Sequence, residues 1–488
     1  MTDVPEVTIN IPSDIQSSTK FADLPLAPML LDSLSKQNIE YMTKVQDLAI
    51  PHILAGSDVA VKAKTGSGKS IAFLLPALDL IYRAQMKPRN GTGVIVMSPT
   101  RELALQLYKV AKELAQDRIQ IGLAVGGTSL QKETEKLAKG CSLVIATPGR
   151  LRDHIANSIG FKFSHLFLII FDEADLLLDL GFEEEISQLL DVLPNAETRQ
   201  TALFSATLSD RVLKLKNLVL KENLVKLDAD EHSTFTTRVN FTQGYIVCPP
   251  DLKFLLLYTF IKKNKNQKII VFMSTCASVE FYSNFLRYIN LDDVHCIYGK
   301  LKQAQRTNVA EQFSKAESGV LIATNVAARG LDIPDVDYII QFDPPDSIES
   351  YVHRAGRACR GTTSRKGTGI LFLSETETGF VKMLSEIGLV LSEFEFPTKK
   401  IINVQEEMEK TVSMNYNLAT LAQAAFRDCC LAYANHSLRK IFDIAKLEVE
   451  KLSKSYGLRV MPRIDAIIGR QRKEMKDRKY GQKDKKEK

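Results

Sequence analysis

Apolar residues between positions 21 and 230 fall in short uninterrupted runs, and amphipathic stretches separate these runs. The apolar segments are "DVAVKA", "GVIVMSPT", "SLVIATP", "LFLIIFDEAD" and "TALFSAT". Strands that are buried on both faces give continuous apolar runs, whereas strands with one wet face alternate apolar and polar residues. The pattern therefore predicts a parallel β-sheet with connecting helices on both of its faces.

The same pattern begins again after about residue 240, with "KIIVFMST", "GVLIATN", "VDYIIQFD" and "GTGILFLS". Between the two halves lies "DADEHSTFTTRVNFTQ", a polar stretch with neither helical nor strand periodicity. Such a stretch is typical of a linker. We therefore predict a first α/β domain over residues 21–230 and a second over residues 231–398, preceded by a flexible N-terminal segment of residues 1–20.

After about Thr398 the spacing of apolar residues becomes that of a helix. Apolar side chains recur at 3.6-residue intervals at Leu418, Leu421, Ala422, Ala425, Phe426 and Cys429. This spacing predicts a helical C-terminal extension over residues 399–465. Residues 466–488 have the composition of a basic disordered tail.

Composition narrows the class of protein. Of 488 residues, 45% are apolar and 25% are charged, which is the balance of a globular protein. No apolar run approaches the ~18 residues that span a bilayer, and the polar, acidic first twenty residues do not resemble a signal peptide. The scattered cysteines contain no CxxC motif, which favours a reducing compartment over a disulfide framework or zinc site.

The net charge of +6 is concentrated at the C-terminus. Residues 466–488 contain ten Lys or Arg and four Asp or Glu, which gives +6, so the remainder of the chain sums to zero. Two interpretations of this tail stay open: a solubilising end, or a patch for nucleic-acid binding or nuclear targeting.

The segment "AKTGSGKS" follows one predicted strand and precedes the apolar helix "SIAFLLPALDLI". In this context a glycine-rich turn and a helix N-terminus cradle phosphate groups with their backbone N–H groups. Lys69 is then placed to reach the β- and γ-phosphates and Ser70 to bind Mg²⁺. The first glycine of the usual pattern is replaced by Ala63. The motif predicts a nucleotide site formed by Ala63, Lys64, Thr65, Gly66, Ser67, Gly68, Lys69 and Ser70.

Acidic residues end the buried run "LFLIIFDEAD". Ligands of open α/β sheets bind at the carboxyl ends of the strands. Asp172 is expected to hold Mg²⁺ and Glu173 to orient or deprotonate the attacking water. By itself the acidic segment is equally compatible with the solvated start of a helix, but a phosphate-binding motif in the same domain favours the catalytic role.

Three arginines lie three residues apart in "HRAGRACRG", at Arg354, Arg357 and Arg360. Phosphoryl transfer requires positive charge on the γ-phosphate, and an arginine finger can supply that charge. We expect Arg357 and Arg360 of the second domain to complete an ATP site on the first.

The ordered motifs resemble those of DEAD-box RNA helicases from about Phe21 to Leu373. The resemblance implies two tandem RecA-like domains and the cofactors ATP and Mg²⁺. It further implies adenine contacts by Phe21 and Gln46, a ribose contact by Asp332, and coupling of ATP to RNA through Ser205 and Thr207. The implied RNA-binding residues are Arg101, Gly127, Thr147, Gly149, Arg150, Arg306 and Thr324.

The segment "YMTKVQ" and the C-terminal extension are similar to a Has-type subgroup of nucleolar DEAD-box helicases. Asn38, Met42 and Asn325 depart from the commoner family pattern, and none removes a group that the chemistry requires. The subgroup implies a monomeric enzyme in the nucleus and nucleolus. Its implied partners are pre-rRNA and pre-ribosomal assembly factors, and its implied process is pre-rRNA processing in large-subunit assembly.

The predicted RNA contacts consist of arginines and backbone groups, which favour phosphates over base edges. We therefore expect an RNA-stimulated ATPase that locally unwinds RNA duplexes. The alternative is an ATP-gated RNA clamp or scaffold for assembly factors with little unwinding, because both uses need the same residues. The full motif set disfavours a DNA translocase.

Overall fold

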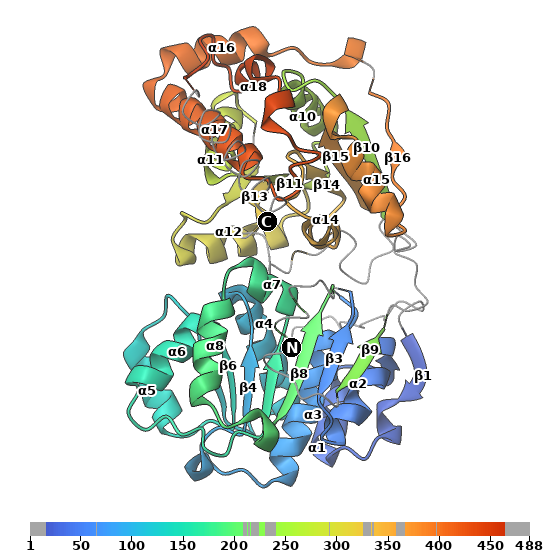
Figure 1. Cartoon of the computed structure of the whole chain (residues 1–488), viewed down its shortest axis with the longest axis vertical. Coiled ribbons are helices and arrows are strands. Elements are labelled where there is room, and N and C mark those ends of the chain that lie inside the picture. The colour runs from blue at the N-terminus through green and yellow to red at the C-terminus, as the bar shows by residue number, and fades with distance from the viewer. Residues whose placement is uncertain are drawn as a thin grey trace, which may run out of the picture. The chain divides into compact units, whose positions relative to one another are not determined.

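The computed structural model describes residues 16–64, 66–207, 212, 215, 224–229, 241–291, 293–325, 333, 336–357, 367–396 and 398–463. The chain divides into two compact units, residues 1–234 and residues 235–488. Each unit contains one seven-stranded sheet (Figure 1). None of the helices in the described ranges is long and apolar enough to cross a membrane.

The sheet of unit 1 has the strand order β5-β6-β4-β7-β8-β3-β9, and every pair of neighbouring strands is parallel. Every residue of β4, β6, β7 and β8 is buried, which explains why these strands are continuous apolar runs in the sequence. The predicted parallel sheet is confirmed. The strands are β3 (Val59–Lys62), β4 (Val94–Met97), β5 (Ile121–Ala124), β6 (Leu143–Ala146), β7 (Leu168–Phe171), β8 (Gln200–Ser205) and β9 (Val225–Asp228).

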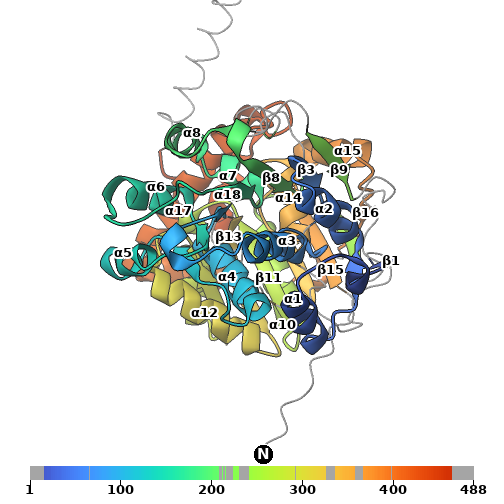
Figure 2. The ribbon, with the colours of Figure 1, turned by 90° about the horizontal axis from the view of Figure 1, so that it is seen from below.

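Alternate residues of each central strand enter two different apolar clusters, because successive side chains point to opposite faces of a sheet. In β4, Val94 and Val96 pack with the first four helices, while Ile95 and Met97 pack with the next four. The two groups are drawn in blue and in teal to green in Figure 2. They are α1 (Pro28–Lys36), α2 (Lys44–Leu54), α3 (Lys69–Arg83) and α4 (Arg101–Ala115), and then α5 (Leu130–Ala138), α6 (Pro148–Asn157), α7 (Ala174–Asp179) and α8 (Glu183–Val192). The short strands β1 (Gln16–Lys20) and β2 (Tyr41–Thr43) form a separate antiparallel pair.

Unit 2 repeats this architecture with the parallel strand order β12-β13-β11-β14-β15-β10-β16. Its strands are β10 (Phe241–Val247), β11 (Lys268–Met273), β12 (Val294–Ile297), β13 (Gly319–Thr324), β14 (Tyr338–Gln341), β15 (Gly367–Leu373) and β16 (Ser392–Glu393). Its helices before the extension are α10 (Lys253–Lys263), α11 (Cys276–Tyr288), α12 (Gln303–Lys315), α14 (Ile348–Ala355) and α15 (Gly379–Glu386).

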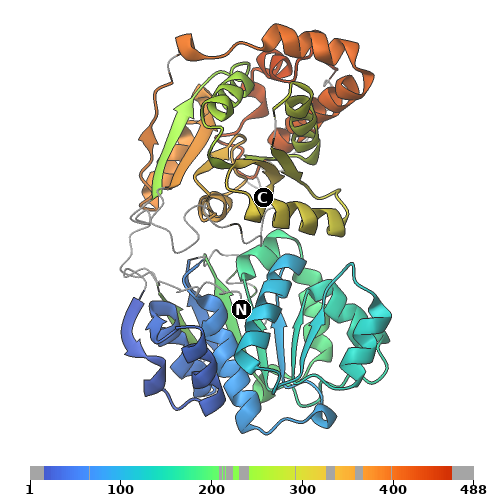
Figure 3. The same cartoon turned by 180° about the vertical axis from the view of Figure 1, so that it is seen from behind.

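The C-terminal extension is helical, as the sequence predicts, and it packs into unit 2 (Figures 1 and 3). It contains α16 (Gln405–Met414), α17 (Tyr416–Ala434) and α18 (Val449–Ser455). The Tyr282 hydroxyl of α11 donates to the Ser455 carbonyl at 3.1 Å, and the Tyr456 ring lies 5.2 Å from the Tyr282 ring. The extension and the second sheet therefore share one apolar core. The predicted basic tail, residues 466–488, lies outside the described residues.

Candidate functional site

The glycine-rich turn of unit 1 connects the end of β3 to the start of α3. Gly66 and Gly68 have φ angles of 77° and 95°, a left-handed conformation that glycine adopts without strain. A Cβ atom on Gly68 would lie 2.6 Å from the Gln46 side-chain nitrogen, so a larger residue would have to displace that side chain. Ser67 Oγ donates to the Lys64 carbonyl at 2.8 Å, which closes the turn. Thr65, also predicted to bind nucleotide, lies outside the described residues.

Lys69 begins α3, and its ammonium is directed back over the turn toward the acidic segment after β7. Its Nζ lies 3.1 Å from Glu173 Oε1 and donates to the Ala63 carbonyl at 3.1 Å. Only 6% of Lys69 is exposed. Burial disfavours the charged form, but the nearby carboxylates, Glu173 above all, outweigh burial and raise the pKa of Lys69. Lys69 is therefore held as a cation at the centre of the site.

The two acidic residues after β7 are buried side by side. Burial, with a smaller contribution from the charge of Glu173, raises the pKa of Asp172 to about 7. Glu173 adopts a left-handed backbone with a φ angle of 48°, and its buried Oε2 has no hydrogen-bond partner among the described residues. A buried carboxylate oxygen without a donor suits a cation, and carboxylate and hydroxyl oxygens are ligands that Mg²⁺ prefers. The carboxylates of Asp172 and Glu173 are thus of the kind that fits Mg²⁺ or activates water, and Ser70 follows Lys69 at the start of α3.

The last residue of this acidic segment, Asp175, connects it to the strand end of β8. Asp175 Oδ2 accepts hydrogen bonds from both the backbone N–H and the hydroxyl of Thr207, each at 3.2 Å. The Asp175 N–H donates to Ser205 Oγ at 3.3 Å. The sequence-based prediction did not include Asp175. The available signal was that Asp175 ends the "DEAD" segment and that the same domain contains the "SAT" segment, residues 205–207.

Of the two residues predicted to contact adenine, Gln46 lies on α2 beside the glycine-rich turn. Gln46 donates to the Gly68 carbonyl at 3.1 Å, and its side-chain oxygen accepts from the Thr43 N–H at 2.8 Å. Phe21 is only 2% exposed and packs in the apolar cluster of the first four helices. The structure therefore places Gln46 directly against the phosphate turn, while the adenine-stacking role of Phe21 stays a prediction.

The RNA-contact residues predicted in unit 1 follow three adjacent strands, β4, β5 and β6. Arg101 begins α4, and its Nη1 donates to the Gly126 carbonyl at 2.7 Å. Thr147 precedes α6, so the N–H of Gly149 lies in the first turn of that helix, where N–H groups lack intrahelical partners. Gly127 has a φ angle of 80° in the turn after β5. Parallel strands end at the same sheet edge, which brings these distant motifs together.

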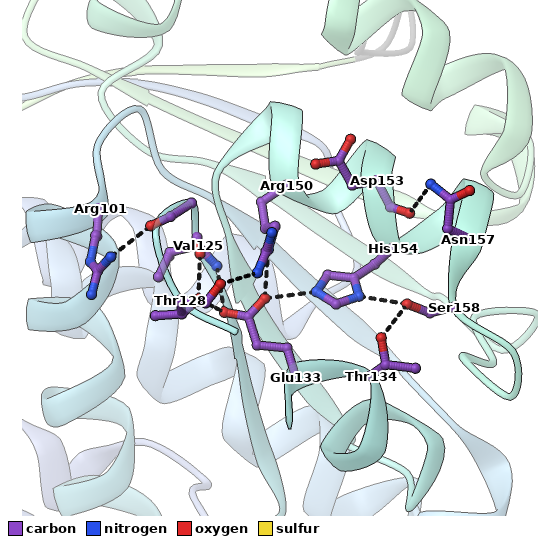
Figure 4. A network of polar contacts seen from close by, with 11 residues as sticks. Arg101, Val125, Thr128, Glu133, Thr134, Arg150, Asp153, His154, Asn157 and Ser158 are labelled. Atoms are coloured by element: carbon purple, nitrogen blue, oxygen red, sulfur yellow. Dashed lines mark hydrogen bonds and ion pairs between the residues drawn. The ribbon is translucent and has the colours of Figure 1, made fainter. Parts of the chain in front are cut away.

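Arg150 belongs to the same group, and its partners were not anticipated from the sequence. Its Nε donates to Glu133 Oε2 at 2.7 Å, and its Nη2 donates to the Thr128 carbonyl at 2.7 Å (Figure 4). Glu133 also accepts from His154 Nε2 at 2.8 Å. In the sequence Glu133 is one of two acidic residues of an amphipathic helix, so no signal distinguished it from a solvated one.

The predicted residues of unit 2 that the structure describes are Arg306, Thr324 and Arg357. Thr324 ends β13, and its hydroxyl is buried. Arg306 lies in the first turn of α12, and Arg357, which is 7% exposed, follows α14. Arg360 and Asp332 lie outside the described residues.

Arg354, the first arginine of the "HRAGRACRG" segment, is buried, and its side chain donates hydrogen bonds within unit 2. Its Nη1 donates to the Asp343 carbonyl at 2.7 Å, and its Nε donates to Asn325 Oδ1. Its guanidinium lies 5.4 Å from the centre of the Phe272 ring. Asn325 is one of the departures from the commoner family pattern. Its side-chain oxygen is neutral, and it still accepts a hydrogen bond from Arg354.

Three family models match consecutive parts of the chain. Residues 43–215 match the DEAD/DEAH box helicase domain, and residues 252–362 match the helicase conserved C-terminal domain. Residues 415–464 match the C-terminal extension of SPB4-like ATP-dependent rRNA helicases.

Curated relatives match almost the whole chain. The ATP-dependent RNA helicase has1 of Emericella nidulans is 47% identical over 469 residues, which cover 96% of this chain and 76% of the relative. The ATP-dependent RNA helicase HAS1 of Saccharomyces cerevisiae is 47% identical over 451 residues, covering 92% of this chain and 89% of the relative.

Solved structures show the same fold. Mss116p bound to single-stranded RNA and AMP-PNP has a TM-score of 0.74 at 26% identity, covering 93% of this chain and 96% of that one. S. cerevisiae Dbp5 bound to RNA and ADP BeF3 has a TM-score of 0.67 at 27% identity, covering 81% of this chain and 99% of that one.

Proposed function

Because this chain belongs to the DEAD-box family of ATP-dependent RNA helicases, we propose that it remodels pre-rRNA during assembly of the large ribosomal subunit, in the nucleolus. The rRNA-helicase extension matched at residues 415–464 supports this process. The observation that carries the enzymatic part is the buried contact of Lys69 with Glu173 at the end of β7.

The phosphate turn and the acidic strand end share the work of ATP hydrolysis. Lys69 and the backbone N–H groups of residues 63–70 bind the phosphates, and Ser70 and Asp172 hold Mg²⁺. When bound, Mg²⁺ neutralises charge on the phosphate oxygens. Glu173 accepts a proton from the attacking water, a role that its buried, unpartnered Oε2 supports.

Asp175 gives the ATP site a direct link to the strand end of β8. Asp175 is hydrogen-bonded to Ser205 and Thr207, so a movement of the acidic segment is expected to move residues 205–207 with it. We assign to this contact the coupling between nucleotide state and RNA affinity. Arg357 and Arg360 act as arginine fingers from unit 2, and Asp332 contacts the ribose.

RNA is bound through its backbone. Arg101, Arg150 and the N–H groups near Gly127 and Gly149 present donors along the ends of β4, β5 and β6, and Arg306 and Thr324 add donors from unit 2. Donors of this kind position phosphates without reading base sequence. Binding is therefore expected to depend steeply on salt and weakly on sequence.

Two assays on the purified protein test this function together. ATP hydrolysis is measured with and without single-stranded RNA, and displacement of a short RNA duplex is measured in parallel. We expect RNA-stimulated hydrolysis and ATP-dependent displacement. Stimulated hydrolysis without displacement would instead favour a clamp or scaffold. Crosslinking to cellular RNA tests the process: sites confined to RNAs other than pre-rRNA would contradict it.

A further inference from the structure

The carboxylate of Glu133 is the centre of a polar network beneath the RNA-facing strand ends of unit 1 (Figure 4). Its Oε1 accepts from the Val125 N–H at 3.4 Å and from the Thr128 hydroxyl. Its Oε2 accepts from Arg150 Nε at 2.7 Å and from His154 Nε2 at 2.8 Å. Both carboxylate oxygens are therefore held by donors, and the Thr128 hydroxyl, which has one proton, also lies 2.7 Å from the Val125 carbonyl.

Buried His154 fixes one side of this carboxylate. The ring is 0% exposed and lies between Glu133 and Ser158, whose hydroxyl is 2.7 Å from Nδ1. A carboxylate only accepts, so Nε2 carries the proton and donates to Glu133. Ser158 in turn lies 2.8 Å from the Thr134 hydroxyl, which ties the end of α6 back to α5. The carboxylate cannot rotate without breaking this chain.

The opposite side of the network holds Arg150. Its Nε bonds Glu133 and one Nη2 hydrogen bonds the Thr128 carbonyl, so two of its five N–H donors are used within the protein. Its side chain is only 12% exposed, which restricts the guanidinium to one direction. The same carboxylate holds the Val125–Thr128 turn that contains Gly127. One side chain therefore sets the position of two predicted RNA-contact elements.

We propose that Glu133, braced by His154, is a positioning residue for RNA binding that fixes Arg150 and the 125–128 turn in one shared arrangement. The inference rests on the proposed function, in which Arg150 and the turn bind RNA phosphates. A guanidinium that is oriented beforehand loses less conformational freedom when a phosphate binds, which strengthens binding. Glu133 itself touches no phosphate.

Simple electrostatics predicts the opposite effect, which makes the proposal easy to test. A carboxylate close to an RNA path repels phosphates, so its removal by charge alone should tighten binding. Glu133→Gln removes the negative charge. It also replaces one carboxylate oxygen by an N–H₂ group, which cannot accept the hydrogen bonds that Arg150 and His154, or Val125 and Thr128, donate at that position. Positioning therefore predicts weaker RNA binding in this variant, even though the surface becomes more positive.

The experiment is a double-mutant cycle on the full chain, with the affinity for a single-stranded RNA as readout. We expect Glu133→Gln and Arg150→Ala each to weaken binding about tenfold and to lower the salt slope by roughly one, the value of one lost phosphate contact. Together they should weaken binding by clearly less than the product of the two single losses, because part of the effect of Glu133 passes through Arg150. Glu135→Gln, an exposed residue of the same helix, is the matched charge control.

The outcomes separate this inference from the proposed function. If Arg150→Ala leaves RNA affinity and salt slope unchanged, the RNA role of Arg150 is wrong. If Arg150→Ala weakens binding but Glu133→Gln tightens it or has no effect, positioning is wrong and the RNA role stands. Additive losses would show that Glu133 does not act through Arg150 and would overturn the proposal. ATP affinity without RNA and the melting temperature check that each variant is folded.

A second variant decides the question if Glu133→Gln does not fold. Thr128→Val keeps the charge of Glu133 and its contact with Arg150 but removes the hydroxyl that holds the turn. Thr128 is exposed, so the change is compatible with folding. We expect RNA binding about threefold weaker, at the low end of what one hydrogen bond contributes, because the turn is loosened and no phosphate contact is removed. Unchanged RNA affinity in Thr128→Val would overturn the proposal in that case.

Discussion

The two halves of the sheet edge in unit 1 at which the strands end differ in how their carboxylates are hydrogen-bonded. At the ends of β3, β7 and β8, Asp172 has its pKa raised to about 7, and Glu173 Oε2 has no donor among the described residues. Near the ends of β4, β5 and β6, Glu133 of α5 has donors at both oxygens; burial raises its pKa, but hydrogen bonds from His154, Thr128 and Arg150 outweigh burial and hold the pKa below the ordinary value.

This difference fits the roles that we propose for the two halves. A group that binds a metal ion or accepts a proton has to keep an oxygen available, and such groups are destabilising until the ligand arrives. A group that orients an arginine works best when it has no freedom left. The half that we propose binds nucleotide therefore holds a carboxylate oxygen without a donor, and the half that we propose binds RNA holds a carboxylate with donors at both oxygens. Variants of the two halves should differ in both the size and the kind of their effects.

The largest effect is expected in the nucleotide half, from Glu173→Gln. The amide cannot accept a proton from water, so ATP turnover should fall by about 10²- to 10⁴-fold. ATP and RNA should still bind, because the phosphate turn remains. Single-turnover hydrolysis with labelled ATP measures the change, with the exposed Glu184→Gln on α8 as the control. Normal turnover in Glu173→Gln would remove this residue from its role.

Asp175→Asn should have the next largest effect. The amide has one acceptor oxygen, so it cannot accept both from Thr207 at Oδ2 and from the Leu176 N–H at Oδ1, and it removes a negative charge near Lys69. RNA-stimulated hydrolysis should therefore fall about 10- to 100-fold, the range for charge-assisted hydrogen bonds. The sharper readout is the ratio of RNA affinities with and without an ATP analogue. Coupling through Asp175 predicts that this ratio approaches one; an unchanged ratio would contradict the link.

In the RNA half, Arg101→Ala should weaken RNA binding by about tenfold and lower the salt slope by roughly one, because one phosphate contact is lost. Several RNA sequences should be affected alike, since phosphate contacts do not read bases. Titrations of unrelated single strands at several salt concentrations measure both quantities. A loss confined to one sequence would show that Arg101 contacts base edges instead.

The smallest effect concerns pH and stability. The pKa of Glu133 is lowered from 4.5 in the folded protein, so its carboxylate contributes stability that is present above about pH 4.5 and is lost as pH falls through the folded pKa. The melting temperature of the unmodified protein should exceed that of Glu133→Gln by a constant amount near neutral pH. This difference should shrink below pH 4.5, and a constant difference at all pH values would exclude ionisation as its source.

The sequence by itself determined the two parallel α/β sheets, the helical extension, and the candidate chemistry. Continuous apolar runs, the glycine-rich "AKTGSGKS" and the acidic end of "LFLIIFDEAD" are local patterns, and local patterns can be read without knowing which segments meet. Lys69 and Glu173 could be expected to meet because parallel strands end at one edge.

Only the tertiary structure decided which charged residues are partners. Glu133, Arg150 and His154 lie on α5 and α6, and nothing in an amphipathic helix distinguishes a buried acid that bonds a neighbour from a solvated one. Likewise Asn325 receives the hydrogen bond of Arg354, and Tyr456 of the extension lies against Tyr282 of α11. The physical reason is that periodicity records burial, whereas hydrogen-bond partners depend on the packing of segments far apart in the chain.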